Sequence, residues 1–359
     1  EEFKRIEERF FENCHRIGYP QHVIDRVWYE IESFAGYSFS KGHSASYAVE
    51  SYQSLYLKAH YPLEFMVGVI NNFGGFYRTE FYFHEARMSG ARIEAPCVNR
   101  SEHLTTIYGN EIFIGFLHLK SLESKVAKMI PEERKRNGNY TSLDNFLRRI
   151  HLGLEQVRIL IRLGAFRFTN KTKQRLLWEA MLYLSNQNAD KKRRQSTSLF
   201  DTEPREYPLP VLQRQPLEDA FDEIELLGFP LCDPFLLLDT PERGDVVAAE
   251  LMKKIGDKVK IVGYVVTTKN TSTLKGEPMH FGTFYDERGE VFDTVHFPDI
   301  TRKYPFRGRG FYEMRGKVVE DFGVASIEVE YMNKLPMINK RIEQTKEFVE
   351  MRSYGQMSV

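Results

Sequence analysis

The sequence has few cysteines and no long hydrophobic run. Its three cysteines, Cys14, Cys97 and Cys232, lie far apart, so they give neither a zinc-ligand spacing nor an even-numbered disulfide framework. We therefore expect buried free thiols in a reducing, cytoplasmic compartment. No stretch approaches 18 consecutive apolar residues, which excludes an obvious transmembrane helix. The charged N-terminal segment also lacks the apolar core of a signal peptide.

The chain also lacks an initiating methionine, which suggests a fragment of a longer protein. Its 359 residues are too many for one ordinary domain, so we expect two to four compact units. The hydrophobic fraction of 42% and the charged fraction of 28% are ordinary for a globular protein.

Net charge is absent overall but not locally. Residues 118–194 contain 18 Lys and Arg against 7 Asp and Glu, whereas residues 195–250 contain 3 against 13. The formal total of zero therefore hides a basic block followed by an acidic block. Such asymmetry often marks a module that binds polyanions.

Hydrophobic periodicity predicts a multidomain α+β protein. Apolar residues recur every three or four positions near the N-terminus, and every second position from residue 258 onward. Five short strands with a longer gap between the third and fourth are typical of an OB-type β-barrel. The expected parts are helices over 1–91, an extended segment and short helices over 92–185, a linker over 186–216, a helical connector over 217–257, the barrel over 258–336 and a tail over 337–359.

One short stretch combines features of an anion site. In SFSKGHSASYA the serines are candidate caps for a helix. Free backbone amides there, together with Lys41 and His43, suit a phosphate group, and Gly42 permits close approach of the ligand. The alternative is a solvated lysine and a packing histidine. Tyr52, Leu55 and Tyr56 follow at helical spacing, and we expect them in the core.

The longer stretch FAGYSFSKGHSASYAVESYQSLYLKAHYPLEFM closely resembles the fingers motif of the bacterial DNA polymerase III alpha subunit, a C-family replicative polymerase. Ser40 replaces the usual Asn of that motif. The order of later segments is also similar to this family, with a helix-hairpin-helix region, a linker and an OB domain. The matching residues are Lys41, His43, Tyr47, Tyr52, Gln53, Lys58, Tyr61, Pro62, Glu64 and Phe65.

The resemblance implies a role for each part of the chain. Lys41, Gly42, His43 and Tyr47 would bind the incoming deoxynucleotide. No segment resembles the palm with its metal-binding aspartates, so the chain would be the C-terminal part of the subunit. We assign no catalytic or metal-binding residue and no cofactor to this chain, expect Mg²⁺ in the complete polymerase, and predict that the chain alone does not extend a primer.

The helix-hairpin-helix region and the linker suggest further contacts. The first hairpin carries Ser121-Leu122-Glu123-Ser124 where the family commonly has glycines, which puts phosphate binding there in doubt. In the linker, QSTSLF resembles the sliding-clamp-binding peptide, with Gln195, Leu199 and Phe200 as its contacts; an ordinary linker is the alternative. Four arginines are candidate duplex DNA contacts, the alternative being a solvated helical face: Arg148, Arg149, Arg158 and Arg162.

The barrel segment offers cations and aromatic rings for single-stranded DNA. The candidate cations are Lys269, Lys275, Arg307 and Arg309, and the rings include Tyr264, Phe281, Phe284 and Phe292. Strand parity does not say which rings face outward. Two other readings stay open: a stand-alone accessory protein that binds single strands or the clamp, and a scaffold whose barrel contacts only proteins.

Overall fold

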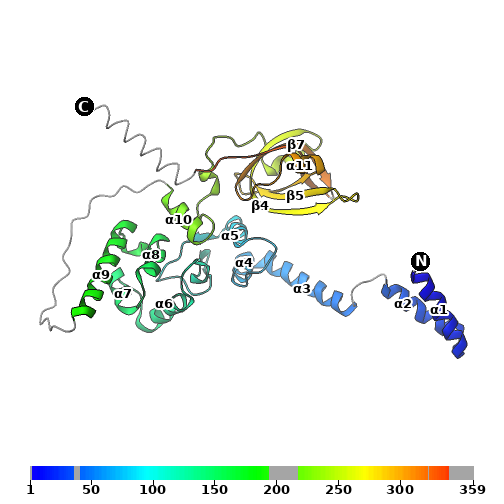
Figure 1. Ribbon diagram of the computed structural model, residues 1–359, viewed down its shortest axis with the longest axis horizontal. Helices are drawn as coiled ribbons and strands as arrows, with labels where there is room; N and C mark the ends of the chain where they lie inside the picture. The colour runs from blue at the N-terminus through cyan, green and yellow to red at the C-terminus, as the bar shows by residue number, and fades with distance from the viewer. Residues whose placement is uncertain (1, 36–40, 194–216, 322, 339–359) are drawn as a thin grey trace. The chain divides into compact units, whose positions relative to one another are not determined.

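The computed structural model describes residues 2–35, 41–193, 217–321 and 323–338 (Figure 1). Two compact units divide at the boundary between Tyr61 and Pro62. The helical part predicted over 1–91 is thus split, because the helices after Pro62 belong to the second unit.

The first unit contains helices and no strand among its described residues. Its α1 and α2 pack through Trp28, whose ring centroid lies 5.5 Å from that of Phe3 and 5.3 Å from that of Phe10. Gly18 ends α1 with φ of +92° and donates its N–H to the Cys14 carbonyl, a left-handed cap that favours glycine. The helices are α1 (Glu2–Ile17), α2 (Gln21–Ala35) and α3 (Lys41–His60).

The second unit begins with two helices and a small sheet. The strands lie in the order β1-β3-β2, with β1 parallel to β3 and β2 antiparallel to it. The hairpin predicted at Gly109 is confirmed, since Thr106 pairs with Phe113 across that turn. The elements are α4 (Pro62–Asn71), α5 (Thr79–Met88), β1 (Arg92–Glu94), β2 (Thr106–Tyr108), β3 (Glu111–Phe113) and η1 (Phe116–His118).

Short helices follow around one aromatic core. Tyr140, Phe146 and Phe166 are at most 1% exposed and meet in edge-on pairs with centroids 5.0 Å apart, a preferred geometry for aromatic rings. Ser142 caps α7 by accepting the Asn145 N–H. The helices are α6 (Ser124–Asn137), α7 (Leu143–Arg149), α8 (Leu154–Arg162), η2 (Arg167–Thr169), α9 (Lys173–Arg193) and α10 (Glu218–Leu226).

The C-terminal strands close into a barrel of order β4-β5-β6-β8-β7. The parallel contact between β6 and β8 and the helix between β6 and β7 give the five-stranded Greek-key topology of an OB fold, which confirms the predicted fold class. Two short helices precede it. The elements are η3 (Pro234–Leu237), η4 (Ala248–Lys254), β4 (Lys258–Ser272), β5 (Pro278–Tyr285), β6 (Val291–His296), α11 (Pro298–Lys303), β7 (Phe311–Asp321) and β8 (Val324–Lys334).

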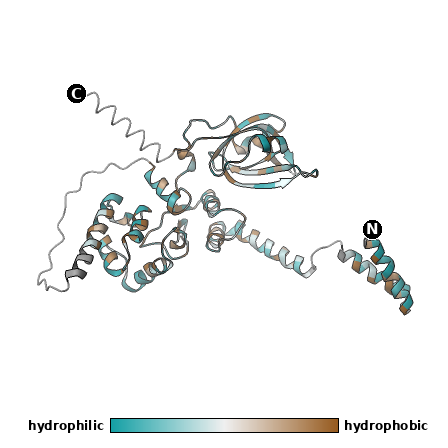
Figure 2. Cartoon of the chain, in the orientation of Figure 1, coloured by the Kyte–Doolittle hydropathy of each residue, from teal (hydrophilic) through white to brown (hydrophobic). Residues whose placement is uncertain are grey.

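Residue alternation explains how the barrel forms. Hydrophobic and hydrophilic residues follow one another along the strands (Figure 2), and the inward ones, such as Ile261, Phe284 and Met314, are completely buried. At Gly316 the β7–β8 register shifts. A Cβ there would lie 2.1 Å from the Glu328 carbonyl oxygen, so this close approach of two strands requires glycine.

Helix α5 is joined to the barrel by buried polar contacts. Arg78 donates to the carbonyls of Val265 and Val266, both at 3.0 Å, where β4 has an irregular register. Tyr264 donates to Glu80 at 3.1 Å. Burial raises the pKa of Glu80, and two nearby arginines oppose that rise. The Val265 and Val266 carbonyls at this irregularity are thereby satisfied by Arg78, the residue that precedes α5.

Candidate nucleic-acid interface

The predicted nucleotide-binding residues lie in the first two turns of α3. A Cβ on Gly42 would meet no atom of the described residues within 4 Å, so none of these residues blocks an approach to the backbone there. The rings of His43 and Tyr47 meet edge-on, with centroids 4.5 Å apart, and Tyr47 is 55% exposed. The side chain of Lys41 lies outside the described atoms. The structure thus brings His43 and Tyr47 together beside an accessible helix start.

The apolar side chains farther along α3 are not in a core. Tyr52, Leu55 and Tyr56 are 73%, 67% and 50% exposed, so the prediction that they are core residues is wrong for this chain. Helical spacing shows that residues share a face, but it does not show whether a partner covers that face.

The first hairpin keeps a glycine-like conformation without a glycine. Ser121 has φ of +64°, a left-handed value that residues other than glycine seldom adopt. Gln156 bonds this turn from α8: its amide nitrogen donates to the Ser121 carbonyl at 3.0 Å, and its amide oxygen accepts the Glu123 N–H at 2.8 Å. A backbone donor of this hairpin is therefore already occupied. Sequence reasoning missed Gln156 because a single polar helix residue carries no pattern.

The second hairpin, residues 150–153, is more open. It joins α7 to α8, and a Cβ on Gly153 would meet no atom within 4 Å. Arg148 and Arg158 lie in the two flanking helices. Arg148 is 70% exposed and pairs with Asp144, and Arg158 is 50% exposed and pairs with Glu155. Such exposed pairs are weak, so both guanidinium groups remain available to an external anion.

Arg149 and Arg162 are engaged within the protein. Arg149 is 15% exposed, donates to Glu133 at 3.0 Å and lies over the Tyr140 ring at 4.3 Å. Arg162 donates to Asp222 at 2.7 Å and to Glu225 at 2.6 Å. These carboxylate contacts raise the pKa of Arg162, against the effect of burial. Both groups hold helices together.

On the barrel, Lys269 and Phe281 lie side by side. They are direct partners in the β4–β5 ladder, and Phe281 is 40% exposed. The other three predicted rings, Tyr264, Phe284 and Phe292, are at most 5% exposed and belong to the packed interior. Lys275 is exposed in the turn between β4 and β5. A cation, a ring and a second cation thus share the outer surface of β4 and β5 and the turn that joins these strands.

The two predicted arginines before β7 differ from each other. Arg309 donates to the Gly228 carbonyl at 2.6 Å and lies 3.8 Å from Glu80, so it links the barrel to α5 and to the end of α10. Arg307 is exposed, and its guanidinium has no ion pair among the described residues.

Some predictions lie outside the described residues. The proposed clamp contacts Gln195, Leu199 and Phe200 fall within 194–216, which the structure does not describe. Among the residues that it does describe, no three His, Cys, Asp or Glu side chains gather in a way that could hold a metal ion. No helix in the described ranges has the length and apolarity needed to span a bilayer.

Known proteins resemble this chain over most of its length. Residues 90–176 match the family model of the helix-hairpin-helix motif. The DNA polymerase III subunit alpha of Treponema pallidum is 31% identical over 315 residues, covering 82% of this chain and 26% of that protein. The subunit of Aquifex aeolicus is 28% identical and covers 97% and 29%. The error-prone DNA polymerase of Bdellovibrio bacteriovorus is 28% identical and covers 90% and 32%.

The chain therefore spans about a third or less of the length of these relatives. Among solved structures, the second OB-fold domain of replication protein A from Methanococcus maripaludis is 12% identical, with a TM-score of 0.18, and covers 24% of this chain and 90% of that one. Sequence similarity over 82–97% of the chain agrees with the order of the helical, helix-hairpin-helix and barrel parts. Over most of its length the chain is therefore similar to a part of the bacterial DNA polymerase III alpha subunits.

Proposed function

We propose that this chain provides binding surfaces for template-directed DNA synthesis within a bacterial replicative polymerase. The observation that carries the proposal is its similarity, over nearly its whole length, to curated DNA polymerase III alpha subunits. Its surfaces would bind the incoming deoxynucleotide, duplex and single-stranded DNA and, through the linker, the sliding clamp. The metal-binding carboxylates and Mg²⁺ of nucleotidyl transfer would be supplied by the rest of the polymerase.

In this proposal the start of α3 binds the triphosphate of the nucleotide. Backbone N–H groups at a helix start favour anions, and the open space at Gly42 leaves them accessible. Lys41 adds a charge, and the His43–Tyr47 pair supplies an exposed polar and aromatic wall.

Replacing Lys41 with alanine in the complete polymerase should therefore weaken nucleotide use but not DNA binding. Loss of a hydrogen bond to a charged group costs about 1.5–3 kcal/mol, which corresponds to roughly 10- to 150-fold in kcat/KM for the nucleotide. Steady-state incorporation on a primed template measures it, with the exposed Lys4→Ala of α1 as control. An unchanged kcat/KM for Lys41→Ala would return this residue to the role of a solvated surface charge.

Duplex DNA would bind at the second hairpin, where Gly153, Arg148 and Arg158 lie, rather than at the first. Single-stranded DNA would bind along Lys269, Phe281 and Lys275. Strand faces and the loop between the first two strands are where OB folds bind nucleic acids. A ring for stacking and adjacent cations are the features that single-strand sites combine.

The barrel proposal is tested with Phe281→Ala in the 359-residue chain. One lost stacking contact is worth about 1–3 kcal/mol, so the Kd for an oligothymidylate should rise roughly 5- to 150-fold. Fluorescence anisotropy over a salt series measures it; Lys269→Ala should reduce the salt slope by about 0.7. The matched control is Phe297→Ala, which removes a ring of similar exposure, 44%. Equal effects of the two phenylalanine variants would reject a specific strand face.

A further inference from the structure

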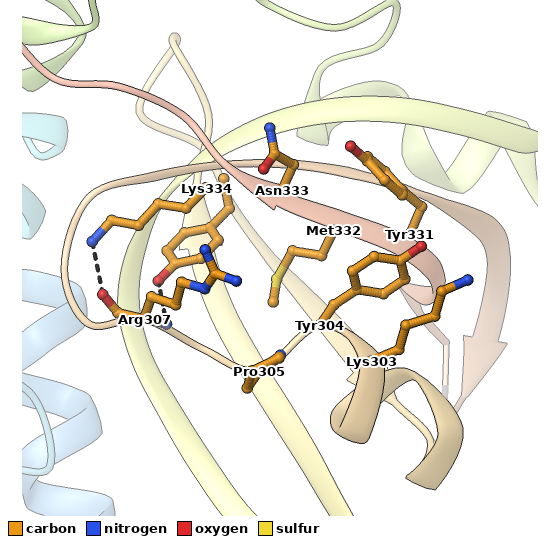
Figure 3. A pocket seen from close by; sticks show the side chains of 9 residues that line it. Lys303, Tyr304, Pro305, Arg307, Tyr331, Met332, Asn333 and Lys334 are labelled. Atoms are coloured by element: carbon orange, nitrogen blue, oxygen red, sulfur yellow. Dashed lines mark hydrogen bonds between the residues drawn. The ribbon is translucent and has the colours of Figure 1, made fainter.

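A cavity of about 240 Å³ opens on a different part of the barrel from the Lys269–Phe281 face. It lies between the segment that follows α11 and the end of β8 (Figure 3). Lys303 and Tyr304 line it from the α11 side, and Tyr331 and Asn333 line it from β8. Because Lys269 and Phe281 lie on β4 and β5, the cavity is a second candidate site on the same domain.

The cavity is positively charged. Lys303, Arg307 and Lys334 line it, and none of its nine described lining residues carries a carboxylate. Lys334 is held in place because its ammonium donates to the Arg307 carbonyl at 2.7 Å. The Tyr312 hydroxyl fixes the same loop: it accepts the Arg307 N–H at 2.9 Å and donates to the Gly308 carbonyl at 2.6 Å. An anionic group is the ligand that this charge favours.

The wall opposite two of these cations is aromatic. The Tyr304 and Tyr331 rings meet edge-on, with centroids 5.1 Å apart. In Figure 3 these rings lie on one side of Met332, and Arg307 and Lys334 lie on the other. Met332 is 4% exposed and forms an apolar floor. Half-buried tyrosines beside an apolar floor provide a surface on which a planar base can stack.

Size and polarity restrict the ligand further. Pockets for drug-sized molecules occupy about 300–1,000 Å³, so a cavity of about 240 Å³ suits one base with its phosphate rather than a longer segment. Asn333 is exposed at the edge of the cavity. Its side-chain amide can donate and accept hydrogen bonds, as the edge of a base requires.

We propose that this cavity binds one nucleotide of a single strand, with the base against Tyr304 and Tyr331 and the phosphate against Arg307 and Lys334. This inference rests on the proposed function, in which the barrel binds single-stranded DNA. It adds a second contact point, so an oligonucleotide long enough to reach both the cavity and the Lys269–Phe281 face binds more tightly than a short one.

The test uses the complete 359-residue chain and two probes. Saturation-transfer NMR with thymidine 5′-monophosphate detects the cavity directly, and 2-deoxyribose 5-phosphate is the probe without a base. Thymine protons should receive saturation from the wild-type chain and from Phe281→Ala, but not from Tyr331→Ala. The sugar phosphate should bind at least fivefold more weakly than the nucleotide, because it lacks the stacking contact.

Anisotropy with a long oligothymidylate supplies the second readout. Tyr331→Ala and Arg307→Glu should each raise the Kd at least fivefold, whereas Tyr331→Phe keeps the ring and should bind as the wild type does. Arg307 is exposed, so its variant tests the charge even if Tyr331→Ala unfolds. Wild-type nucleotide and oligonucleotide binding by Arg307→Glu overturns the proposal. Equal binding of the two small probes overturns the base contact. A wild-type chain that binds the nucleotide but does not bind the oligonucleotide would instead reject the proposed single-strand function.

Discussion

Replacing Arg162 with methionine is expected to lower the free energy of unfolding by about 3 kcal/mol. Arg162 bonds Asp222 through two nitrogens, at 2.8 and 2.7 Å. The Asp222 side chain is only 4% exposed, so removal of the guanidinium leaves a buried carboxylate without its main partner. Lys173 remains 3.1 Å from the other Asp222 oxygen and offsets part of the loss, which places the effect at the lower end of such changes.

Arg158→Met is the matched control, because Arg158 lies one turn earlier in α8. Its pair with Glu155 is exposed, at 50% and 69%, and such pairs contribute less than about 1 kcal/mol. Urea unfolding followed by circular dichroism measures both variants. The double variant Arg162→Met with Asp222→Leu should recover most of the stability, because no buried charge is then left over.

Substitutions of Arg158 and Arg162 should also have different effects on DNA binding. Arg158→Met would remove the phosphate contact that we propose for the second hairpin, so duplex affinity and its salt slope should both fall. A folded Arg162→Met protein should keep the wild-type slope. Similar losses of stability in the two single variants, or a reduced salt slope for Arg162→Met, would contradict this division of roles.

The barrel was predictable from the sequence because its signal is local. Alternating apolar residues, glycine-bearing turns and the longer gap before Phe311 specify strand number and order without knowledge of distant contacts. Local pattern could not show which rings face outward. The ladder contacts decide this, since Phe281 lies opposite Lys269 on the outer surface whereas Phe284 lies inside.

The arginines were harder to interpret because their partners are distant in sequence. The asymmetry between the basic block 118–194 and the acidic block 195–250 predicts a polyanion-binding module from the sequence alone. In the folded chain the blocks partly neutralise each other: Arg162 bonds Asp222 and Glu225, and Lys173 bonds Asp219. Charge asymmetry along a sequence therefore also reflects ion pairs within the protein. The exposure of each side chain is needed to distinguish Arg158, which is available to a ligand, from Arg162, which is engaged in such a pair.

The first hairpin has a conformation that its missing glycines do not reveal. Glycines mark backbone positions with positive φ, and their absence near Ser121 puts phosphate binding by this hairpin in doubt. The turn keeps φ of +64° at Ser121, and hydrogen bonds from the Gln156 side chain compensate for the strain. A side chain from α8 thus preserves the shape while it occupies one of the donors.

Replacing Glu223 with glutamine is expected to stabilise the protein at pH 8 by about 3 kcal/mol, and not at all at pH 4. Burial raises the pKa of Glu223 from 4.5 to about 7. Asp219 and Asp222 raise this pKa as well, whereas the bond from the Leu231 N–H, 2.7 Å from Glu223 Oε2, and the charge of Lys173 lower it. Glutamine keeps an oxygen that accepts this N–H but carries no charge.

The direction in which stability changes with pH follows from proton binding to Glu223. The folded state holds a proton on Glu223 up to about pH 7, whereas the unfolded state releases it near its ordinary value of 4.5. The stability that this proton contributes is complete below pH 4.5 and is lost as pH rises through 7. The wild-type chain should therefore become less stable over this window, and Glu223→Gln should not share that loss.

Urea unfolding of Glu223→Gln and the wild type at half-unit steps from pH 4 to 8 measures the difference. Glu250→Gln, which changes an exposed carboxylate before the barrel, is the control and should follow the wild-type curve. A constant gap between Glu223→Gln and the wild type across this range would show that the substitution acts through packing. A difference in the free energy of unfolding that appears between pH 5 and 7 would show that the buried carboxyl of Glu223, at the end of α10, makes the protein less stable as it ionises. The Leu231 N–H bond to the ionised carboxylate would then be too weak to offset its desolvation.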